Sequence, residues 1–234
     1  MSPRVLNLQG LEIAYSLNFN SYLKNLVEFT YASWNLSSMF ITETDSIKKL
    51  NPKQKVIRYM IGKSLRLLRS IKSLTEIGYW PEAEILVRAM VETEALLLYV
   101  LKDKTNKTAN KWLNRKNPKE RWDWTELTKE LPTTFRTMYT NLSLYPHNHV
   151  LSTISYTHLS NGLVLLQRGP LGGNGHNEKA EQVLGFSALL NSALCEIGTS
   201  QFKLSKDWQE KHIEFEKMPY FLTIKERLQK KDKT

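Results

Sequence analysis

The stretch GYWPEAEILVRAMVETEALLLYVLKD, residues 78–103, decides the fold of this chain. Pro81 suits the first turn of a helix, and Glu82 places a negative charge near the positive end of the helix dipole. Apolar side chains cover almost the whole circumference of the segment, which is typical of a buried helix. We therefore predict a central helix from Pro81 to about Lys102.

Helical periodicity also dominates the rest of the chain, and strand-like alternation is scarce. Further helices are expected over about 12–40, 53–77, 133–144, 148–166 and 178–203, with one or two more in the tail. The predicted fold is all-α, an irregular bundle of six to eight helices, with the segments 53–77, 81–102 and 148–166 at its centre. We predict two parts: a helical bundle domain of residues 1–204 and a basic C-terminal helical tail of residues 205–234.

Composition points to a cytoplasmic protein that does not enter a membrane. The sequence holds no apolar run of about 18 residues, the length that a membrane-spanning helix needs. Its first residues lack the compact apolar core of a secretory signal. The single Cys195 excludes an internal disulfide, which suits a reducing compartment.

The net charge of +10 is concentrated in a few segments. On a helical wheel, one half of the predicted helix at 53–77 carries a basic stripe, and the other half is apolar. The stripe consists of Lys55, Arg58, Lys63, Arg66 and Arg69. It fits a nucleic acid, RNA more than DNA, and it equally fits a solvated surface.

Arg88 and Glu92 lie one turn apart on a narrow polar strip of the 81–102 helix. The strip has two interpretations, which the sequence leaves open. It is either the exposed edge of a buried helix, with a weak surface pair, or the lining of a polar cleft between helices.

The residues of this helix resemble the signature of a prokaryotic family known as domain of unknown function 5677. The matching positions are Gly78, Glu82, Ala83, Leu86, Val87, Arg88, Glu92, Tyr99 and Asp103. The family has a second element of the form L/I-S-x-x-H, which Ile154, Ser155 and His158 match; Ser143 and His147 offer a competing match. The resemblance covers about residues 78–165 and implies that Arg88, Glu92 and His158 meet inside the bundle.

A looser similarity to HEPN-type helical proteins, found among antiviral systems, suggests an RNA-associated effector of phage defence or a toxin. In that hypothesis, a metal-independent ribonuclease uses Arg88 to bind phosphate, His158 as general acid and base, Glu92 to orient one of them, and Ser155 beside His158. Arg168 and His176 do not have the spacing of the usual HEPN site. The alternative is a non-enzymatic scaffold or partner-binding module in which Arg88, Glu92 and His158 form a buried structural network.

Metal or cofactor binding is not expected from the sequence. His147, His149 and His158 are close in sequence, but no nearby carboxylate or thiol cluster completes a ligand set. Partners compatible with the sequence are RNA, a protein encoded in the same operon, and a second copy of the chain in a homodimer.

Overall fold

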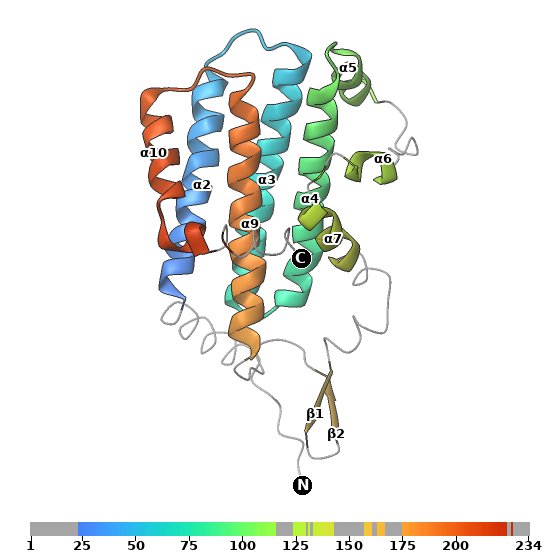
Figure 1. The fold of residues 1–234 in the computed structure, drawn as a ribbon, viewed down its shortest axis with the longest axis vertical. Coiled ribbons are helices and arrows are strands. Elements are labelled where there is room, and N and C mark those ends of the chain that lie inside the picture. The colour runs from blue at the N-terminus through green and yellow to red at the C-terminus, as the bar shows by residue number, and fades with distance from the viewer. Residues whose placement is uncertain are drawn as a thin grey trace.

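Four long helices form the centre of the molecule in the computed structural model, and the second of them along the chain runs antiparallel to the other three (Figure 1). They are α2 (Lys24–Asp45), α3 (Pro52–Glu76), α4 (Trp80–Lys102) and α9 (Gly175–Thr199). The structure describes residues 23–115, 124–129, 131, 133–142, 157–160, 163–166, 175–223 and 226. The predicted all-α bundle of six to eight helices is confirmed for these described residues, which contain eight helices, and α3 and α4 begin and end within one residue of the predicted bounds.

Local sequence signals hold α3 and α4 in an antiparallel pair. The Asn51 side chain accepts a hydrogen bond from the backbone N–H of Gln54, and the Gln54 side chain accepts one from the backbone of Asn51, at 2.9 and 3.0 Å. At the other end of α3, Gly78 has a φ of 88°, which favours glycine. The N–H of Tyr79 bonds to the Leu74 carbonyl at 2.8 Å, and that of Gly78 to Thr75 at 3.1 Å. These two hydrogen bonds form a Schellman motif, which ends α3 and turns the chain directly into α4.

α9 occupies the central place that we predicted for the segment 148–166, because it packs against α2, α3 and α4. A polar seam runs through this packing. The Asn191 side chain accepts from the Ser64 hydroxyl at 2.9 Å and donates to the Ser33 carbonyl at 2.9 Å and to the Ser37 hydroxyl. Each of these side chains is fully buried. Because the groups satisfy one another, the seam fixes the register of α9 against α2 and α3.

Shorter helices flank this core. α10 (Lys206–Glu216) packs on α2, α5 (Lys107–Leu113) meets α3, and both α6 (Trp124–Thr128) and α7 (Thr133–Leu142) lie across α4. α10 is anchored by Trp208, which is 3% exposed and donates from its indole nitrogen to the Leu36 carbonyl at 3.0 Å. The predicted division at residues 204/205 stays a prediction, although α10 contributes Trp208 and Phe215 to the core.

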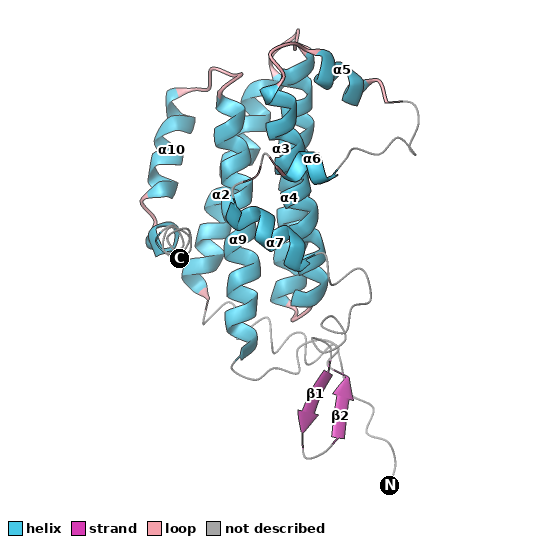
Figure 2. Ribbon diagram, turned by 45° about the vertical axis from the view of Figure 1, so that its right-hand side comes forward, coloured by secondary structure: helices cyan, strands magenta, loops and turns pink. Residues whose placement is uncertain are grey.

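The helix predicted over 148–166 is wrong where the structure describes it. Strands β1 (Thr157–Ser160) and β2 (Leu163–Leu166) form an antiparallel hairpin, with His158 opposite Leu165. The intervening sequence Asn161-Gly162 is the strongest short hairpin signal, and it outweighs the apolar periodicity. The hairpin lies beyond the end of the helical core in both views (Figures 1 and 2).

The remaining predicted helices agree in place and differ in their ends. The described part of the 12–40 helix continues to Asp45, α7 begins at Thr133 as predicted, and α9 covers Gly175–Thr199 where a helix over 178–203 was predicted. None of the helices in the described ranges is both long enough and apolar enough to cross a membrane.

Candidate functional site

Arg88 and Glu92, the polar strip of α4, pair with each other. Arg88 Nε donates to Glu92 Oε1 at 3.1 Å, and the two side chains are 19% and 22% exposed. The strip is therefore neither fully solvated nor fully buried. The strip is largely covered, so it lies between the two predicted possibilities, an exposed helix edge and the lining of a buried polar cleft.

Tyr139 of α7 completes this group. Arg88 Nη2 donates to the Tyr139 hydroxyl at 3.2 Å, and that hydroxyl donates to Glu92 Oε1 at 3.4 Å. The guanidinium carbon of Arg88 also lies 5.1 Å from the centre of the Tyr139 ring, a cation–π geometry. Arg88, Glu92 and Tyr139 thus form a closed network, named here the Arg88 network, which fastens α7 to α4.

Lys63 of α3 lies close enough to this network to respond to it. Burial lowers the pKa of Lys63, and the Glu92 carboxylate partly offsets that effect by favouring the charged amine. Lys63 is also a member of the basic stripe, so it links the stripe of α3 with the polar strip of α4.

The stripe faces outward, as predicted, at four of its five positions. Lys55, Lys63, Arg66 and Arg69 are exposed. Arg58 is partly covered and forms an ion pair with Asp45 of α2. The outer face of α3 therefore carries four exposed cations, three of them at successive turns from Lys63 to Arg69, a spacing that suits a chain of phosphates.

Residues 54–133 match the model of the family of unknown function DUF5677. The match confirms the predicted resemblance over roughly a third of the chain and includes α3, α4 and α5. It covers the first motif, with Arg88 and Glu92, but not the second, with Ser155 and His158. No curated protein and no solved structure matches the chain, and the looser similarity to HEPN-type proteins is not shown by these comparisons.

Within the segment that matches DUF5677, Tyr59 is the exposed aromatic residue of the basic stripe. Its side chain is 60% exposed, and on the α3 wheel it lies between Lys55 and Lys63. The ring of Trp112 from α5 lies 6.0 Å from the Tyr59 ring, at an interplanar angle of 41°. Tyr59 was not predicted, because the stripe was defined by its cations alone, although the same helical wheel places the tyrosine among them.

α5 brings further positive charge to this place. Lys107 and Lys111 are exposed on the helix that carries Trp112. The carboxylate of Asp103 accepts the backbone N–H groups of Thr105 and Thr108, each at 2.8 Å, and these bonds hold the pKa of Asp103 well below its usual range. Asp103 thereby fixes the start of α5 against the end of α4.

The imidazole expected beside Arg88 is not among the described side chains. His158 lies on β1 by its backbone, and Ser155 falls outside the described residues, so the catalytic roles predicted for them stay predictions. The helix predicted over 148–166, which held both Ser155 and His158, is wrong at His158, because His158 lies on strand β1. Tyr139 was not predicted, because only the docking of α7 on α4 shows that it reaches Arg88.

Glu94 of α4 is a second carboxyl group that needs explanation. It is 3% exposed, its Oε2 atom has no hydrogen-bond partner, and burial raises its pKa to about 8. At neutral pH the group is therefore mostly protonated, which removes the larger cost of a buried charge.

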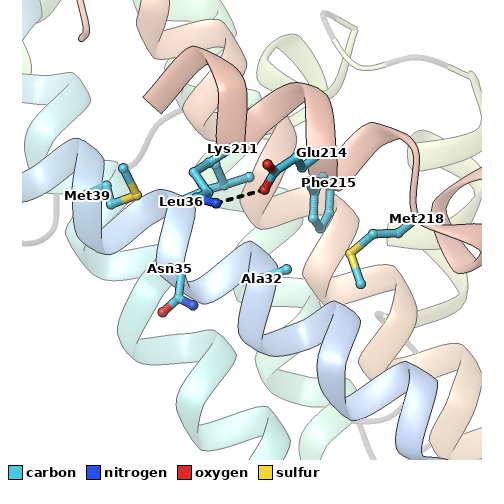
Figure 3. A pocket seen from close by; sticks show the side chains of 8 residues that line it. All are labelled: Ala32, Asn35, Leu36, Met39, Lys211, Glu214, Phe215 and Met218. Atoms are coloured by element: carbon cyan, nitrogen blue, oxygen red, sulfur yellow. Dashed lines mark hydrogen bonds and ion pairs between the residues drawn. The ribbon is translucent and has the colours of Figure 1, made fainter. Parts of the chain in front are cut away.

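A hollow of about 290 Å³ lies between α2 and α10 (Figure 3). Met39, Phe215 and Met218 supply most of its apolar lining, and the Lys211–Glu214 ion pair of 2.9 Å borders it. None of the residues predicted for catalysis or nucleic-acid binding lines this hollow.

Proposed function

We propose that this protein binds single-stranded RNA along the outer face of α3. The observation that carries the proposal is the 60% exposure of Tyr59 within the basic stripe, beside Trp112. A solvated basic helix has no need of an exposed ring. Single-strand binders, in contrast, combine cations that follow the backbone with aromatic rings on which bases stack.

The cations of the stripe supply the attraction to phosphate. Lys63, Arg66 and Arg69 follow Tyr59 along α3, and Lys107 and Lys111 lie on the neighbouring α5. Double-stranded nucleic acid keeps its bases stacked inside the helix, so it cannot use the Tyr59 ring in this way. The combination therefore favours a single strand.

The test is fluorescence anisotropy with labelled single-stranded RNA, at several salt concentrations. The variant K63A/R66A/R69A is expected to reduce the slope of log affinity against log salt by about 2, since each cation contributes about 0.7 on a single strand. At about 0.1 M salt, this corresponds to roughly a hundredfold weaker binding.

The matched control is K24A/K206A/K211A, which removes the same charge from exposed positions of α2 and α10. It is expected to bind RNA nearly as the wild type does. Equal losses in the two triple variants would reduce the interaction to net charge and reject the interface. Single-stranded DNA and duplex RNA are measured alongside, and a preference for either of them would contradict the proposed ligand.

A second candidate function is a non-enzymatic module that docks a partner protein. The closed Arg88 network favours it, because a guanidinium already bonded to Glu92 and Tyr139 is a structural tie between α4 and α7. If this candidate function is correct, the wild type binds RNA negligibly. The K63A/R66A/R69A variant then fails to co-purify with the partner protein that the wild type retains.

We also propose that RNA binding serves a phage-defence or toxin-type effector in the cytoplasm. The support for this role is the looser sequence similarity to HEPN-type helical proteins, because the match to a family of unknown function supplies no activity. Induced expression in a bacterial host is expected to slow growth, and variants R88A and H158A separate catalysis from binding. If both variants are as toxic as the wild type, the ribonuclease hypothesis is rejected.

A further inference from the structure

Glu196, His212 and Glu216 form a cluster of side chains at the junction of α9 and α10. One ligand-type atom from each residue lies within 4.8 Å of the other two. His212 and Glu216 are one turn apart on the same face of α10, and Glu196 comes from α9. The cluster lies away from the stripe of α3, and it depends on no part of the proposed RNA interface.

The imidazole of His212 is held in a fixed plane. It stacks on the Trp208 ring, with centroids 5.1 Å apart and an interplanar angle of 15°. Trp208 is itself held by the hydrogen bond to the Leu36 carbonyl of α2. Because the indole is buried and bonded, His212 is oriented before any ligand arrives, which lowers the entropy cost of binding.

The two carboxylates of the cluster lack the lysine partners that two other carboxylates of α10 have. Glu210 and Glu214 of α10 have lysine partners at 3.2 and 2.9 Å. Within the part of the chain that the structure describes, neither Glu196 nor Glu216 has an ion-pair partner, and no hydrogen bond joins either of them to His212. Two negative charges therefore converge on an imidazole without a cation to balance them.

We propose that Glu196, His212 and Glu216 bind a divalent first-row transition ion such as Zn²⁺ or Mn²⁺. One imidazole nitrogen and two carboxylate oxygens suit these ions, which accept both donor types. Bonds to such an ion are about 2.0–2.2 Å long, so the ligand atoms have to approach one another by about 1 Å. Glu196 is exposed and can supply this movement by rotating its side chain.

Glu216 is the last residue of α10, and the electrostatic field at this end of the helix favours the binding of a cation. The C-terminal end of a helix carries partial negative charge, which attracts a cation. Three protein ligands leave at least one coordination position for water. A bound ion would also join α10 to α9, because Glu196 comes from α9 and the other two ligands come from α10.

The experiment is isothermal titration calorimetry with ZnCl₂ and MnCl₂ on the full chain after removal of metals with EDTA. The wild type is expected to bind one ion at this site, and H212A and E216Q are each expected to weaken binding by more than about tenfold. E210Q is the matched control on the same helix, and it is expected to retain wild-type affinity. Circular dichroism confirms that each variant is folded.

A second measurement distinguishes this site from the other histidines of the chain. Zn²⁺ is expected to raise the melting temperature of the wild type and of H147A/H149A/H158A/H176A, but not that of H212A. The proposal is overturned if H212A binds Zn²⁺ as the wild type does, if the quadruple histidine variant loses binding, or if neither ion binds. Mg²⁺ is expected to bind weakly, and tight Mg²⁺ binding that is independent of His212 would also overturn it.

Discussion

α3 and α4 lie side by side, and both carry charged residues at helical spacing, yet they use them differently. On α4, Arg88 is bonded to Glu92 and Tyr139 and is 19% exposed. On α3, Arg66 and Arg69 point into solvent. The difference is a covering element, because α7 crosses α4 at the level of Arg88. Whether a charged strip is a structural tie or a binding surface therefore depends on what packs over it.

The largest effect is expected at Glu94, which shows how α4 tolerates a charged residue type in the core. The folded state holds the Glu94 proton up to about pH 8, whereas the unfolded chain releases it near 4.5. The free energy of unfolding should therefore fall as pH rises from about 4.5 to about 8, by on the order of 3–5 kcal/mol. E94Q should remove this part of the pH dependence in urea unfolding measured across that window.

The control for this measurement is E28Q, a change at an exposed carboxylate of α2. Its pH dependence should follow that of the wild type. An E94Q profile that coincides with the wild-type profile would mean that Glu94 is ionised in the folded protein.

The next largest effect compares the stability contribution of the paired Arg88 with that of the exposed Arg66. R88A should lower the free energy of unfolding by about 2–3 kcal/mol, because it leaves Glu92 and Tyr139 without their charged partner. R66A removes the same side chain from an exposed position and should change stability by less than about 0.5 kcal/mol. RNA affinity should show the reverse order, with a loss in R66A alone. A stability loss of equal size in the two variants would contradict the view that Arg88 is a structural tie and Arg66 part of a binding surface.

A smaller effect is expected from the ring of Tyr59. Y59A should weaken single-stranded RNA binding by about 1–2 kcal/mol, or about five- to thirtyfold, because one base loses its stacking surface. Y59F keeps the ring and should bind as the wild type does. If Y59F were as weak as Y59A, the hydroxyl group rather than stacking would be responsible.

The smallest effect is expected at Arg58. Its pairing with Asp45 makes it resemble Arg88 more than its neighbours on the stripe. R58A should therefore change RNA affinity by less than about twofold, whereas K63A should change it by about fivefold. A loss in R58A as large as that in K63A would show that the ion pair opens on binding.

Sequence periodicity was sufficient for α3 and α4, since each has apolar positions at helical spacing, and Asn51 and Gly78 mark the start and the end of α3. It failed at residues 157–166, where the apolar spacing suggested a helix and the Asn161-Gly162 dipeptide favoured a hairpin. That error also placed His158 on the wrong type of element. Short apolar runs fit both the helical and the strand periodicity, so a turn dipeptide is the better evidence in such a segment.

The candidate sites were predictable only where one helix holds all the members. Arg88 and Glu92 are one turn apart, so their pairing follows from the sequence. Tyr139 is separated from them by about 50 residues, and it meets them through the docking of α7. Glu196 and His212 likewise belong to two helices, and no spacing rule connects them. Contacts between helices depend on packing that a single wheel does not contain.

The left-handed glycine at position 78 restricts the length of the connection between α3 and α4. One residue inserted beside Gly78 would rotate α4 by about 100° relative to α3. Glu94 would then turn away from the apolar interior, and Glu92 would move away from Lys63. Insertions and deletions should therefore be excluded from this turn in related sequences and tolerated in the connection between α5 and α6. An alignment of relatives can show this pattern without any measurement on the protein.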